Sequence, residues 1–382
     1  MKKPFYHSDF KLGVLGGGQL GRMLIQDAIN INVAVHCLDP DPSAPCAKLA
    51  SSFTVGNLKD YDTVINFGKD KDVLTIEIEH VNVDALETLE KSGVIVYPQP
   101  NILRMIQDKG LQKQFYADNN IPTADFKLID DAKELSSGNI QFPIVQKMRK
   151  GGYDGKGVQV LKSVADLDKA FNEPSVLENM VSFTKELSVI VARNKQGDIA
   201  TYPVVDMEFN AEANLVEFLF SPADITEEIE QKATAIAKQV AEATNMVGIL
   251  AVELFLTANG DILVNEVAPR PHNSGHQTIE GNITSQYEQH LRAILNLPLG
   301  STTITKPSVM VNLLGEKEHT GEVHYEGLSE TLSMEGVHVH LYGKSQTKPF
   351  RKMGHITVTD NTVFRAKEKA KKVKETLKSK TI

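Results

Sequence analysis

The sequence has little cysteine, no long apolar run and no excess of positive charge, and each shortage excludes a class of protein. Cys37 and Cys46 cannot supply a disulfide framework or a zinc site, so we expect a reducing, cytoplasmic location. No apolar run is long enough to span a membrane, and the N-terminal MKKPFYHSDF lacks the apolar core of a signal peptide. The net charge of −8 argues against nucleic acid as a partner.

A chain of 382 residues predicts two or three domains, with boundaries that we place at 1–105, 106–300 and 301–382. The first hundred residues alternate strand and helix patterns, which predicts a doubly wound parallel sheet of the α/β class. Strands are expected at 12–16, 32–39, 72–79 and 93–98, and helices at 19–29, 83–91 and 102–119.

From Pro122 onward, short strands and hairpins predict an α+β region, with long helices at 226–244 and 285–295. After Pro298 we expect a small β-rich segment that ends in a lysine-rich helix. The expected strands of the two regions are 143–148, 157–161, 175–179, 186–194, 199–207, 215–220, 309–314 and 337–343.

Two apolar runs flank Asn259-Gly260, a pair that predicts a two-residue hairpin turn. Such a turn pairs Ala258 with Asp261 and brings Glu253 directly across from Glu266. The face that they share is expected to carry Phe255, Thr257, Ile262 and Val264, and the other face Val252, Leu254, Leu256, Leu263 and Val267. A hairpin that is apolar on both faces is buried, and two buried carboxylates that lie so close must share a proton or a cation. Mg²⁺ prefers such oxygen ligands. The alternative is a frayed hairpin in which both glutamates reach solvent.

The glycine-rich segment Gly16–Gly21 follows a predicted strand and opens a predicted helix. Its G-x-G-x-x-G pattern, with Asp39 at the end of the next strand, is typical of a nicotinamide dinucleotide site. A different phosphate held at the same helix N-terminus, or a glycine turn without a ligand, are the alternatives.

A second glycine-rich segment, Arg149–Gly157, argues against a dehydrogenase. Its backbone N–H groups can surround an anion, to which Lys156 and Arg149 add positive charge, although it lacks the ending of a Walker loop. Lys147 lies in an apolar strand, where a buried ammonium needs an anionic partner. A hairpin loop with incidental charges and a lysine on an exposed strand face are the alternatives. Taken alone, Glu178–Val181 is typical of a hinge and Glu186 of a surface acid.

Six segments together, GGGQLGRM, EIEHV, GGYDGKG, ENMV, NEVAPRPHNSGH and LYGK, resemble the ATP-grasp superfamily. Within it, the chain from Lys11 to the C-terminus is similar to the 5-(carboxyamino)imidazole ribonucleotide synthetase family. The resemblance implies a homodimer of three-domain subunits that clamp ATP between two β-subdomains. It also implies ATP-dependent carboxylation of 5-aminoimidazole ribonucleotide with bicarbonate in purine biosynthesis, through carboxyphosphate, with ADP and phosphate as products.

The resemblance also implies roles for individual residues. Asn179–Val181 would line the adenine, Glu186 would hold the ribose, and Glu253 and Glu266 would bind Mg²⁺, with two ions expected. The residues implied for ATP are Arg104, Lys147, Gly152, Tyr153, Asp154, Gly155, Lys156, Gly157, Val158, Glu178, Asn179, Met180, Val181, Glu186, Asn265 and Glu266. Those implied for the ribonucleotide and bicarbonate are Gln19, Glu77, Tyr153, Asp154, Arg270, Lys344, Arg351 and Lys352. Those implied for catalysis are Arg270, His272, Asn273, Tyr153 and Lys344.

One segment departs from the family pattern, because relatives often carry a histidine where this chain has Asp206–Asn210. The nearest competing function is that of a formate-dependent glycinamide ribonucleotide transformylase. Relatives of that enzyme typically have Glu at the position of Gln19 and a different sequence after Pro271-His272. Two more functions stay open at this point, that of a dehydrogenase and that of a catalytically inactive nucleotide-binding module.

Overall fold

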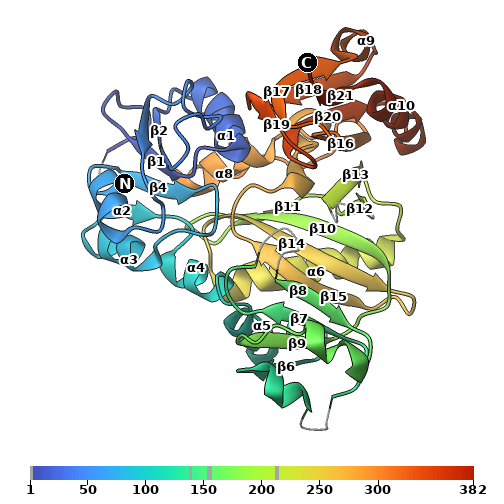
Figure 1. The fold of residues 1–382 in the computed structure, drawn as a ribbon. Helices are drawn as coiled ribbons and strands as arrows, with labels where there is room; N and C mark the ends of the chain where they lie inside the picture. The colour runs from blue at the N-terminus through green and yellow to red at the C-terminus, as the bar shows by residue number, and fades with distance from the viewer. Residues whose placement is uncertain (1–2, 137–139, 153–156, 211–214) are drawn as a thin grey trace.

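The computed structural model describes residues 3–136, 140–152, 157–210 and 215–382. The N-terminal part is a parallel sheet of order β3-β2-β1-β4-β5 with helices beside it (Figure 1). Its elements are β1 (Leu12–Leu15), α1 (Gln19–Asn30), β2 (Val35–Asp39), β3 (Ser52–Val55), α2 (Tyr61–Gly68), β4 (Val73–Ile76), α3 (Val83–Lys91) and β5 (Ile95–Val96). The doubly wound sheet is confirmed, whereas β3 and α2 were not predicted. β4 is shorter than expected, because Glu77 already leaves the strand.

The helix expected at 102–119 is wrong, because two helices occupy this segment: α4 (Pro100–Ile106) and α5 (Lys109–Asp118). Asp108 interrupts the helix with an extended backbone, and its carboxylate accepts hydrogen bonds from the backbone N–H groups of Gly110 and Leu111. An aspartate at this position starts a new helix. Lys109 therefore becomes the first residue of α5.

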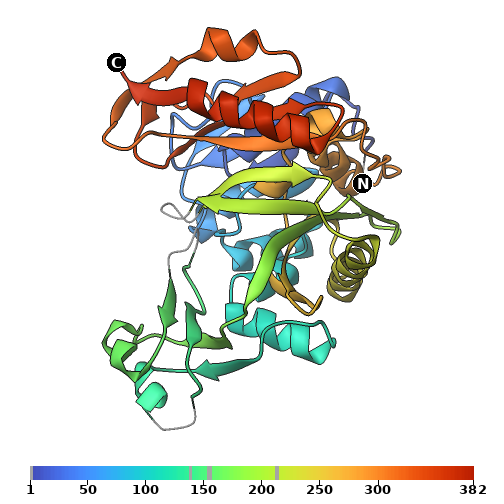
Figure 2. The ribbon, with the colours of Figure 1, turned by 90° about the vertical axis from the view of Figure 1, so that its right-hand side faces the viewer.

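A small antiparallel sheet of order β6-β9-β7-β8 follows and forms the lower lobe in Figure 2. It contains β6 (Phe126–Ile129), β7 (Ile144–Met148), β8 (Val158–Leu161) and β9 (Ser175–Asn179), with short helical turns at Ala132–Ser136 and Val164–Lys169. β6 was not predicted. Lys147, in the middle of β7, is 9% exposed, so the expectation of a buried lysine is confirmed.

The largest sheet has the order β15-β14-β10-β12-β13-β16-β20-β18, with β11 paired to β10. Its central strands are β10 (Phe183–Arg193), β11 (Ile199–Thr201), β12 (Val205–Asn210), β13 (Leu215–Ser221), β14 (Gly248–Thr257) and β15 (Ile262–Ala268). The single strand expected at 199–207 is wrong, since β11 and β12 are separate. α6 (Glu227–Thr244), with Thr226 as its N-cap, covers one face of β10, β14 and β15 through a shared apolar core.

The hairpin of β14 and β15 brings Glu253 opposite Glu266 as predicted, but by a different route. The turn has three residues, because Thr257 pairs with Asp261 and Gly260 lies in the left-handed region at φ 81°. The predicted pairing of Ala258 with Asp261 is therefore wrong. The resulting one-residue offset is cancelled at a β-bulge, where Asn265 is the extra residue.

The three-residue turn also corrects the predicted faces of the hairpin. Leu254 pairs with Val264 and Leu256 with Ile262, and these four side chains are buried against α6. Ile262 and Val264 therefore do not share the face of Glu253, whereas Leu263 lies across from Phe255 on that face. That face is only partly buried, so the prediction of burial on both faces is wrong.

The C-terminal part continues the large sheet. β13 pairs with β16 (Ser308–Leu314), followed by β20 (Lys352–Thr359) and β18 (Val337–Leu341). A second sheet combines β19 (Gln346–Thr347), β17 (Gly321–Glu326) and β21 (Lys378–Thr381), with α9 (Leu328–Leu332) and α10 (Val363–Thr376) nearby. The last described element is β21, not the lysine-rich helix that was expected.

The parts of the chain are joined by more than their connecting segments. α8 (Gln286–Ile294), with Ser285 as its N-cap, packs Tyr287 and Leu291 into the core of the N-terminal sheet. The pairing of β13 with β16 crosses the boundary that we placed at residue 300. The domain boundaries therefore remain a proposal. Among the described residues, no helix is both long and apolar enough to cross a membrane.

Candidate active site

Three glutamates from neighbouring strands lie on one face of the large sheet. Ser188 pairs with Glu253 and Glu186 with Phe255, so β10 and β14 present Glu186 and Glu253 to the same side, and Glu266 joins them from β15. Burial raises the pKa of Glu253, and the charges of Glu266 and Glu186 raise it further. Lys109 holds the pKa of Glu266 well below its usual value. Close carboxylates that titrate apart in this way share a proton or bind a cation.

Glu186 is not an ordinary surface acid, because burial raises its pKa to about 7, with a further contribution from Glu266. Glu186 pairs with Phe255 on β14 and with Met207 on β12. The ring of Phe255 stacks on that of Phe183, with ring centroids 4.6 Å apart, whereas Met207 is buried. Asp206, from the segment without a histidine, forms an ion pair with Lys185. A carboxylate therefore lies beside an aromatic surface.

Lysines from α5 and β7 face these acids. Lys109 Nζ lies 2.6 Å from Glu266 Oε2, and Lys147 Nζ lies 3.0 Å from Asn265 Oδ1. The bulge therefore brings both Asn265 and Glu266 to the lysines. Glu178, 4% exposed, forms ion pairs with Lys147 at 3.0 Å and with Lys113 at 3.2 Å. Burial lowers the pKa of Lys113 to about 8.

Lys109 and Lys113 were missed by the sequence analysis. Within a continuous helix, both lysines are typical of a solvated face. Asp108 is the signal in the sequence that could have revealed Lys109. Aspartate is a preferred N-cap residue, so it indicates that a new helix starts at Lys109 and that this lysine does not continue the exposed face of the preceding helix. In the structure, Asp108 also binds Arg149 through two hydrogen bonds of 2.8 Å. Arg149 is thus committed to Asp108 and anchors the second glycine loop to the start of α5.

The second glycine loop joins β7 to β8, as predicted. Of its predicted ATP contacts, Gly152, Gly157 and Val158 are described, and Gly157 is left-handed at φ 76°. Tyr153, Asp154, Gly155 and Lys156 lie outside the described residues.

The end of β9 offers an apolar surface near the acids. Asn179 and Met180 are exposed and Val181 is half-buried, with Met180 51% exposed. Phe183, 42% exposed, follows them on β10. The segment is therefore the end of a strand with exposed side chains, not a bare hinge.

Arg104 is not brought to this group. Its guanidinium lies 2.6 Å from Asp84 and 2.8 Å from Glu87, both on α3, and its side chain is 47% exposed. These contacts hold it on the N-terminal lobe. The ATP contact implied for Arg104 therefore stays a prediction, and Lys109 is a cation that the structure places beside the acids.

A second polar group lies where the N-terminal lobe meets the C-terminal segment. Burial lowers the pKa of Lys344 to about 8, with contributions from Arg351 and Lys352, while Glu77 raises it. Burial also raises the pKa of Glu77 to about 7, which Arg270 opposes. These five charged residues therefore interact across the interface. Arg270 also lies 2.8 Å from Glu79, and Lys344 donates to the backbone oxygen of Lys352 at 2.7 Å.

The first glycine loop is occupied by side chains of the protein itself. Gly17 N donates to Asp39 Oδ2 at 2.7 Å, and Gly21 N donates to Glu77 Oε2 at 3.0 Å. A Cβ at Gly18 would lie 2.3 Å from Glu77 Oε1. Two acids thus take the positions from which a dinucleotide's phosphates and ribose would be held. Gln19 opens α1 beside them. The arrangement argues against a dehydrogenase.

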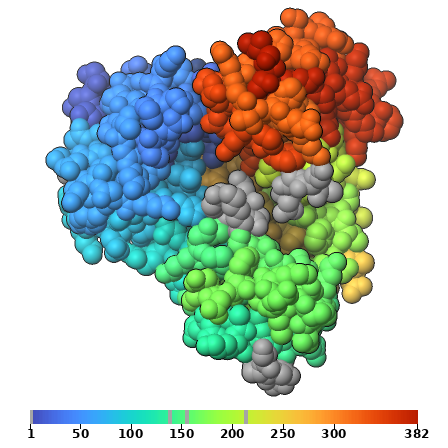
Figure 3. Space-filling model, in the orientation of Figure 1, coloured from blue at the N-terminus to red at the C-terminus, as the bar shows by residue number. Residues whose placement is uncertain are grey.

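His272 and Asn273 lie at the end of the hairpin segment, between the two polar groups. His272 Nε2 is 3.5 Å from Glu253 Oε1. Burial lowers the pKa of His272 to about 3, helped by the charges of Arg270 and Lys352. Asn273 starts the short turn Asn273–Gly275. The space-filling view shows a recess where the lobes meet (Figure 3).

The carboxylates suit a divalent cation. Glu253 and Glu266 lie directly across from each other, and the ammonium of Lys109 already lies against one of them. Among the described residues, no group of three or more His, Cys, Asp and Glu is arranged to hold a metal. Carboxylate oxygens are the ligands that Mg²⁺ prefers, and the ion usually completes its shell with water and substrate phosphates.

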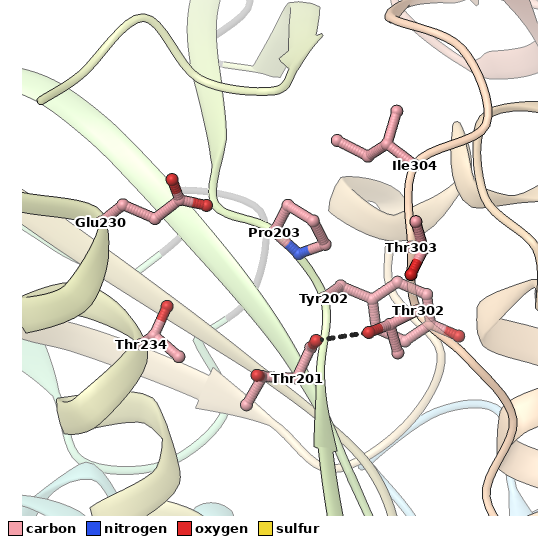
Figure 4. A pocket seen from close by; sticks show the side chains of 8 residues that line it. All are labelled: Thr201, Tyr202, Pro203, Glu230, Thr234, Thr302, Thr303 and Ile304. Atoms are coloured by element: carbon pink, nitrogen blue, oxygen red, sulfur yellow. Dashed lines mark hydrogen bonds between the residues drawn. The ribbon is translucent and has the colours of Figure 1, made fainter. Parts of the chain in front are cut away.

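Two surface cavities lie away from these groups. One, of about 480 Å³, is lined by Thr201, Tyr202, Pro203, Glu230, Thr234, Thr302, Thr303 and Ile304 (Figure 4). The other, of about 490 Å³, lies near Lys69–Asp72 and Ser92–Ile95. Neither contains a residue of the polar groups described here.

Models of known families match three segments of the chain. Residues 10–107 match the ribonucleotide synthetase preATP-grasp domain, residues 114–287 the ATP-grasp domain, and residues 308–369 the phosphoribosylaminoimidazole carboxylase C-terminal domain. With the clamp of acids and lysines between two antiparallel sheets, these matches define an ATP-grasp protein.

Curated relatives narrow the class. The N5-carboxyaminoimidazole ribonucleotide synthase of Bacillus subtilis is 38% identical over 365 residues, which cover 94% of this chain and 93% of the relative. A chloroplastic phosphoribosylaminoimidazole carboxylase of Vigna aconitifolia is 40% identical, and the match covers 92% of this chain but only 64% of that protein. The chain belongs to the N5-carboxyaminoimidazole ribonucleotide synthase family, a family of ATP-grasp ligases.

Solved structures agree. The synthetase from Thermotoga maritima has a TM-score of 0.90 at 45% identity, with 98% of this chain and 100% of that chain covered. The Aspergillus clavatus synthase in complex with ADP and 5-aminoimidazole ribonucleotide has a TM-score of 0.88 at 34% identity, with 96% and 98% covered.

Proposed function

We propose that this protein uses ATP to carboxylate the exocyclic amine of 5-aminoimidazole ribonucleotide with bicarbonate. The observation that carries the proposal is the clamp in which Glu186, Glu253 and Glu266 face Lys109 and Lys147. A second charged group, Glu77 with Lys344, lies at the adjoining interface. The Aspergillus clavatus relative binds a nucleotide and a ribonucleotide together, which two such groups would require.

The chemistry explains why both groups are needed. Bicarbonate is a poor electrophile, and transfer of the γ-phosphoryl group to it gives carboxyphosphate, which has a better leaving group. Phosphoryl transfer depends on positioning and charge neutralisation more than on covalent help from the protein. Lys109 and Lys147 would neutralise the phosphates, while Asn179–Val181 and Phe183 would hold the adenine and Glu186 the ribose. Tyr153–Lys156 of the second glycine loop remain predicted contacts.

Glu253 and Glu266 would hold Mg²⁺, with Asn265 alongside. The ion supplies charge stabilisation and a template for the phosphates. Lys109 would then exchange Glu266 for a phosphate, because the ammonium and the ion compete for the same carboxylate.

The ribonucleotide would occupy the interface between the N-terminal and C-terminal parts. Arg351 and Lys344 would bind its phosphate, and Glu77 and Gln19 its neutral polar groups. Arg270, His272 and Asn273 lie between this group and the glutamates, where carboxyphosphate must meet the amine before water does. Lys352 lies close enough to His272 to lower its pKa and is a second candidate for the phosphate.

A homodimer, a cytoplasmic location and a second Mg²⁺ are further proposals that follow from the family. The two cysteines are free and buried, which agrees with a reducing compartment.

The proposal is tested by measuring ADP formation with two sets of acceptors. We expect turnover with bicarbonate and 5-aminoimidazole ribonucleotide, and none with formate and glycinamide ribonucleotide. The opposite result would identify the transformylase, and no ADP with either set would indicate an inactive nucleotide-binding module.

The metal assignment is tested by Glu266→Gln. The change keeps the shape of the side chain and removes the charge that would hold Mg²⁺, so ADP formation should fall by a factor of at least ~10². Glu230→Gln, on α6 at the cavity of Figure 4, is a matched control that should keep its turnover. Near-normal ADP formation by Glu266→Gln would remove the metal assignment.

A further inference from the structure

The main chain of His272 is held by a buried amide. Gln286, 0% exposed, accepts a hydrogen bond from His272 N at 2.8 Å and donates one to His272 O at 2.7 Å. A Cβ at Gly275 would lie 2.4 Å from Gln286 Oε1, so only glycine leaves room for this contact. The start of α8 thereby fixes the position from which the His272 ring projects.

The ring itself is held at Nδ1. The backbone N–H of Ser274 donates to His272 Nδ1 at 3.3 Å, and Ser274 Oγ lies 2.9 Å from the same nitrogen. A backbone N–H can only donate, so Nδ1 must be the acceptor. A neutral imidazole has one donor and one acceptor nitrogen, and the proton therefore lies on Nε2.

A second buried serine, Ser188, continues this chain of hydrogen bonds. Ser188 Oγ lies 2.8 Å from Ser274 Oγ, and both serines are 0% exposed. With Nδ1 as acceptor, the Ser274 hydroxyl donates to the ring and is free to accept from Ser188. Ser188 pairs directly with Glu253 on the neighbouring strand. The chain of hydroxyls thus begins beside the carboxylate that His272 Nε2 faces at 3.5 Å.

We propose that Ser274 is a positioning residue that fixes the orientation and tautomer of His272, with Nδ1 as the acceptor and Nε2 as the hydrogen-bond donor. The donor faces Glu253 in the protein alone, and in the loaded enzyme it would face an oxygen of phosphate or bicarbonate. His272 therefore stabilises negative charge instead of removing the proton of the amine. A neutral imidazole with a capped Nδ1 is a known way to polarise an oxygen. Only the identity of that oxygen rests on the proposed function.

The tautomer is measured directly by NMR of protein labelled with ¹⁵N-histidine, without substrate or metal. His272→Gln removes the signals of this ring and so assigns them. We expect an unprotonated Nδ1 and a protonated Nε2. A protonated Nδ1 would overturn the proposal. This measurement needs no turnover, so a protein inactive with 5-aminoimidazole ribonucleotide would contradict the proposed function and leave the tautomer decided.

The role of Ser274 is tested by Ser274→Ala, with Ser274→Thr to restore the hydroxyl. Ser274→Ala keeps the long backbone hydrogen bond to Nδ1 but removes the shorter one from the hydroxyl, so the share of the tautomer protonated at Nδ1 should rise and kcat should fall about tenfold, with the KM for ATP changed less than about twofold. Ser274→Thr should recover most of both. Ser379→Ala removes a buried hydroxyl in β21 and serves as the control. An unchanged tautomer and kcat in Ser274→Ala would overturn the proposal. If that variant does not fold, the tautomer of the unaltered protein decides.

Discussion

Buried lysines at this site are stabilised by the acids that they face. Lys113 and Lys147 share the carboxylate of Glu178, and all three residues are almost fully buried. Removing one partner of such a group leaves an unpaired buried charge, which costs about 3–5 kcal/mol. Lys109 and Glu266 form a less buried pair, with side chains 23% and 44% exposed. Lys109 is therefore the cation that can move to a ligand.

Lys109→Met should weaken binding of Mg-ADP at least about tenfold, because the ammonium nearest Glu266 is lost. Arg104→Met should leave the affinity unchanged, because Asp84 and Glu87 on α3 hold its guanidinium. Titration calorimetry measures both. A larger loss in Arg104→Met than in Lys109→Met would favour the ATP contact predicted for Arg104 from the sequence.

The sequence predicted the acids of the site better than its cations. The pairing of Glu253 with Glu266 was predicted from a two-residue turn, and it holds because the bulge at Asn265 cancels the offset of the actual three-residue turn. The burial of Lys147 was predicted because an ammonium in an apolar strand needs a partner. Lys109 was missed because the charge of a helical lysine is ordinarily solvated. Its role depends on the break between α4 and α5 at Asp108. The carboxylate of Asp108 binds Arg149, which lies 41 residues further along the chain.

At the scale of elements, α8 joins two sheets through one buried histidine. His290 Nδ1 accepts from Ile249 N on β14 at 3.2 Å, and its Nε2 lies 3.0 Å from Thr75 Oγ1 on β4. Burial lowers the pKa of His290 to about 3. The histidine stays neutral in the folded protein while the unfolded chain binds a proton below its usual pKa of 6.5. Its contribution to stability is therefore complete above pH 6.5 and is lost as the pH falls toward the folded pKa.

His290→Asn tests this sign, because asparagine can still accept from Ile249 but does not titrate. Between pH 8 and pH 5.5, keeping His290 neutral should lower the free energy of unfolding by about 1.4 kcal/mol. The loss of stability between these pH values should be smaller by that amount in the variant, as measured by urea unfolding. Glu77 has a raised pKa and acts in the opposite direction, but it contributes equally to both proteins. His338→Asn, at an exposed site, is the control. An unchanged pH dependence in His290→Asn would contradict the assignment.

Elements with a strong periodic pattern were predicted well, and short polar ones were not. α3 and α6 begin and end within a residue of their expected bounds because a capping side chain starts each helix. β3 has exposed or half-buried residues throughout, so it lacks the alternation that identifies a strand. Its position is set by pairing with β2. That pairing is a tertiary contact, which local sequence cannot report.

At the scale of the whole molecule, the three predicted regions share structure. β13 pairs with β16, and Phe218 and Phe220 belong to the same core as α10. α8 belongs to the core of the N-terminal sheet. The alternation of strands and helices predicted the type of each region, but nothing local indicated that one sheet would run through two of them.

Heating should therefore produce one cooperative transition, in which the calorimetric and van't Hoff enthalpies agree. A truncation after Gly300 should expose the edge of β13 together with Phe218 and Phe220 and fail to fold. Separate transitions, or a folded truncated protein, would show that the boundary at residue 300 divides independent domains.

The bulge at Asn265 has a consequence for chain length. Without the bulge, the regular alternation along β15 would place Asn265 opposite Glu253 and carry Glu266 to the side of Val252, against α6. A carboxylate in that apolar interior would destabilise the fold. Deleting Asn265 should accordingly leave Glu266 opposite Glu253, whereas straightening the strand with all its residues would not.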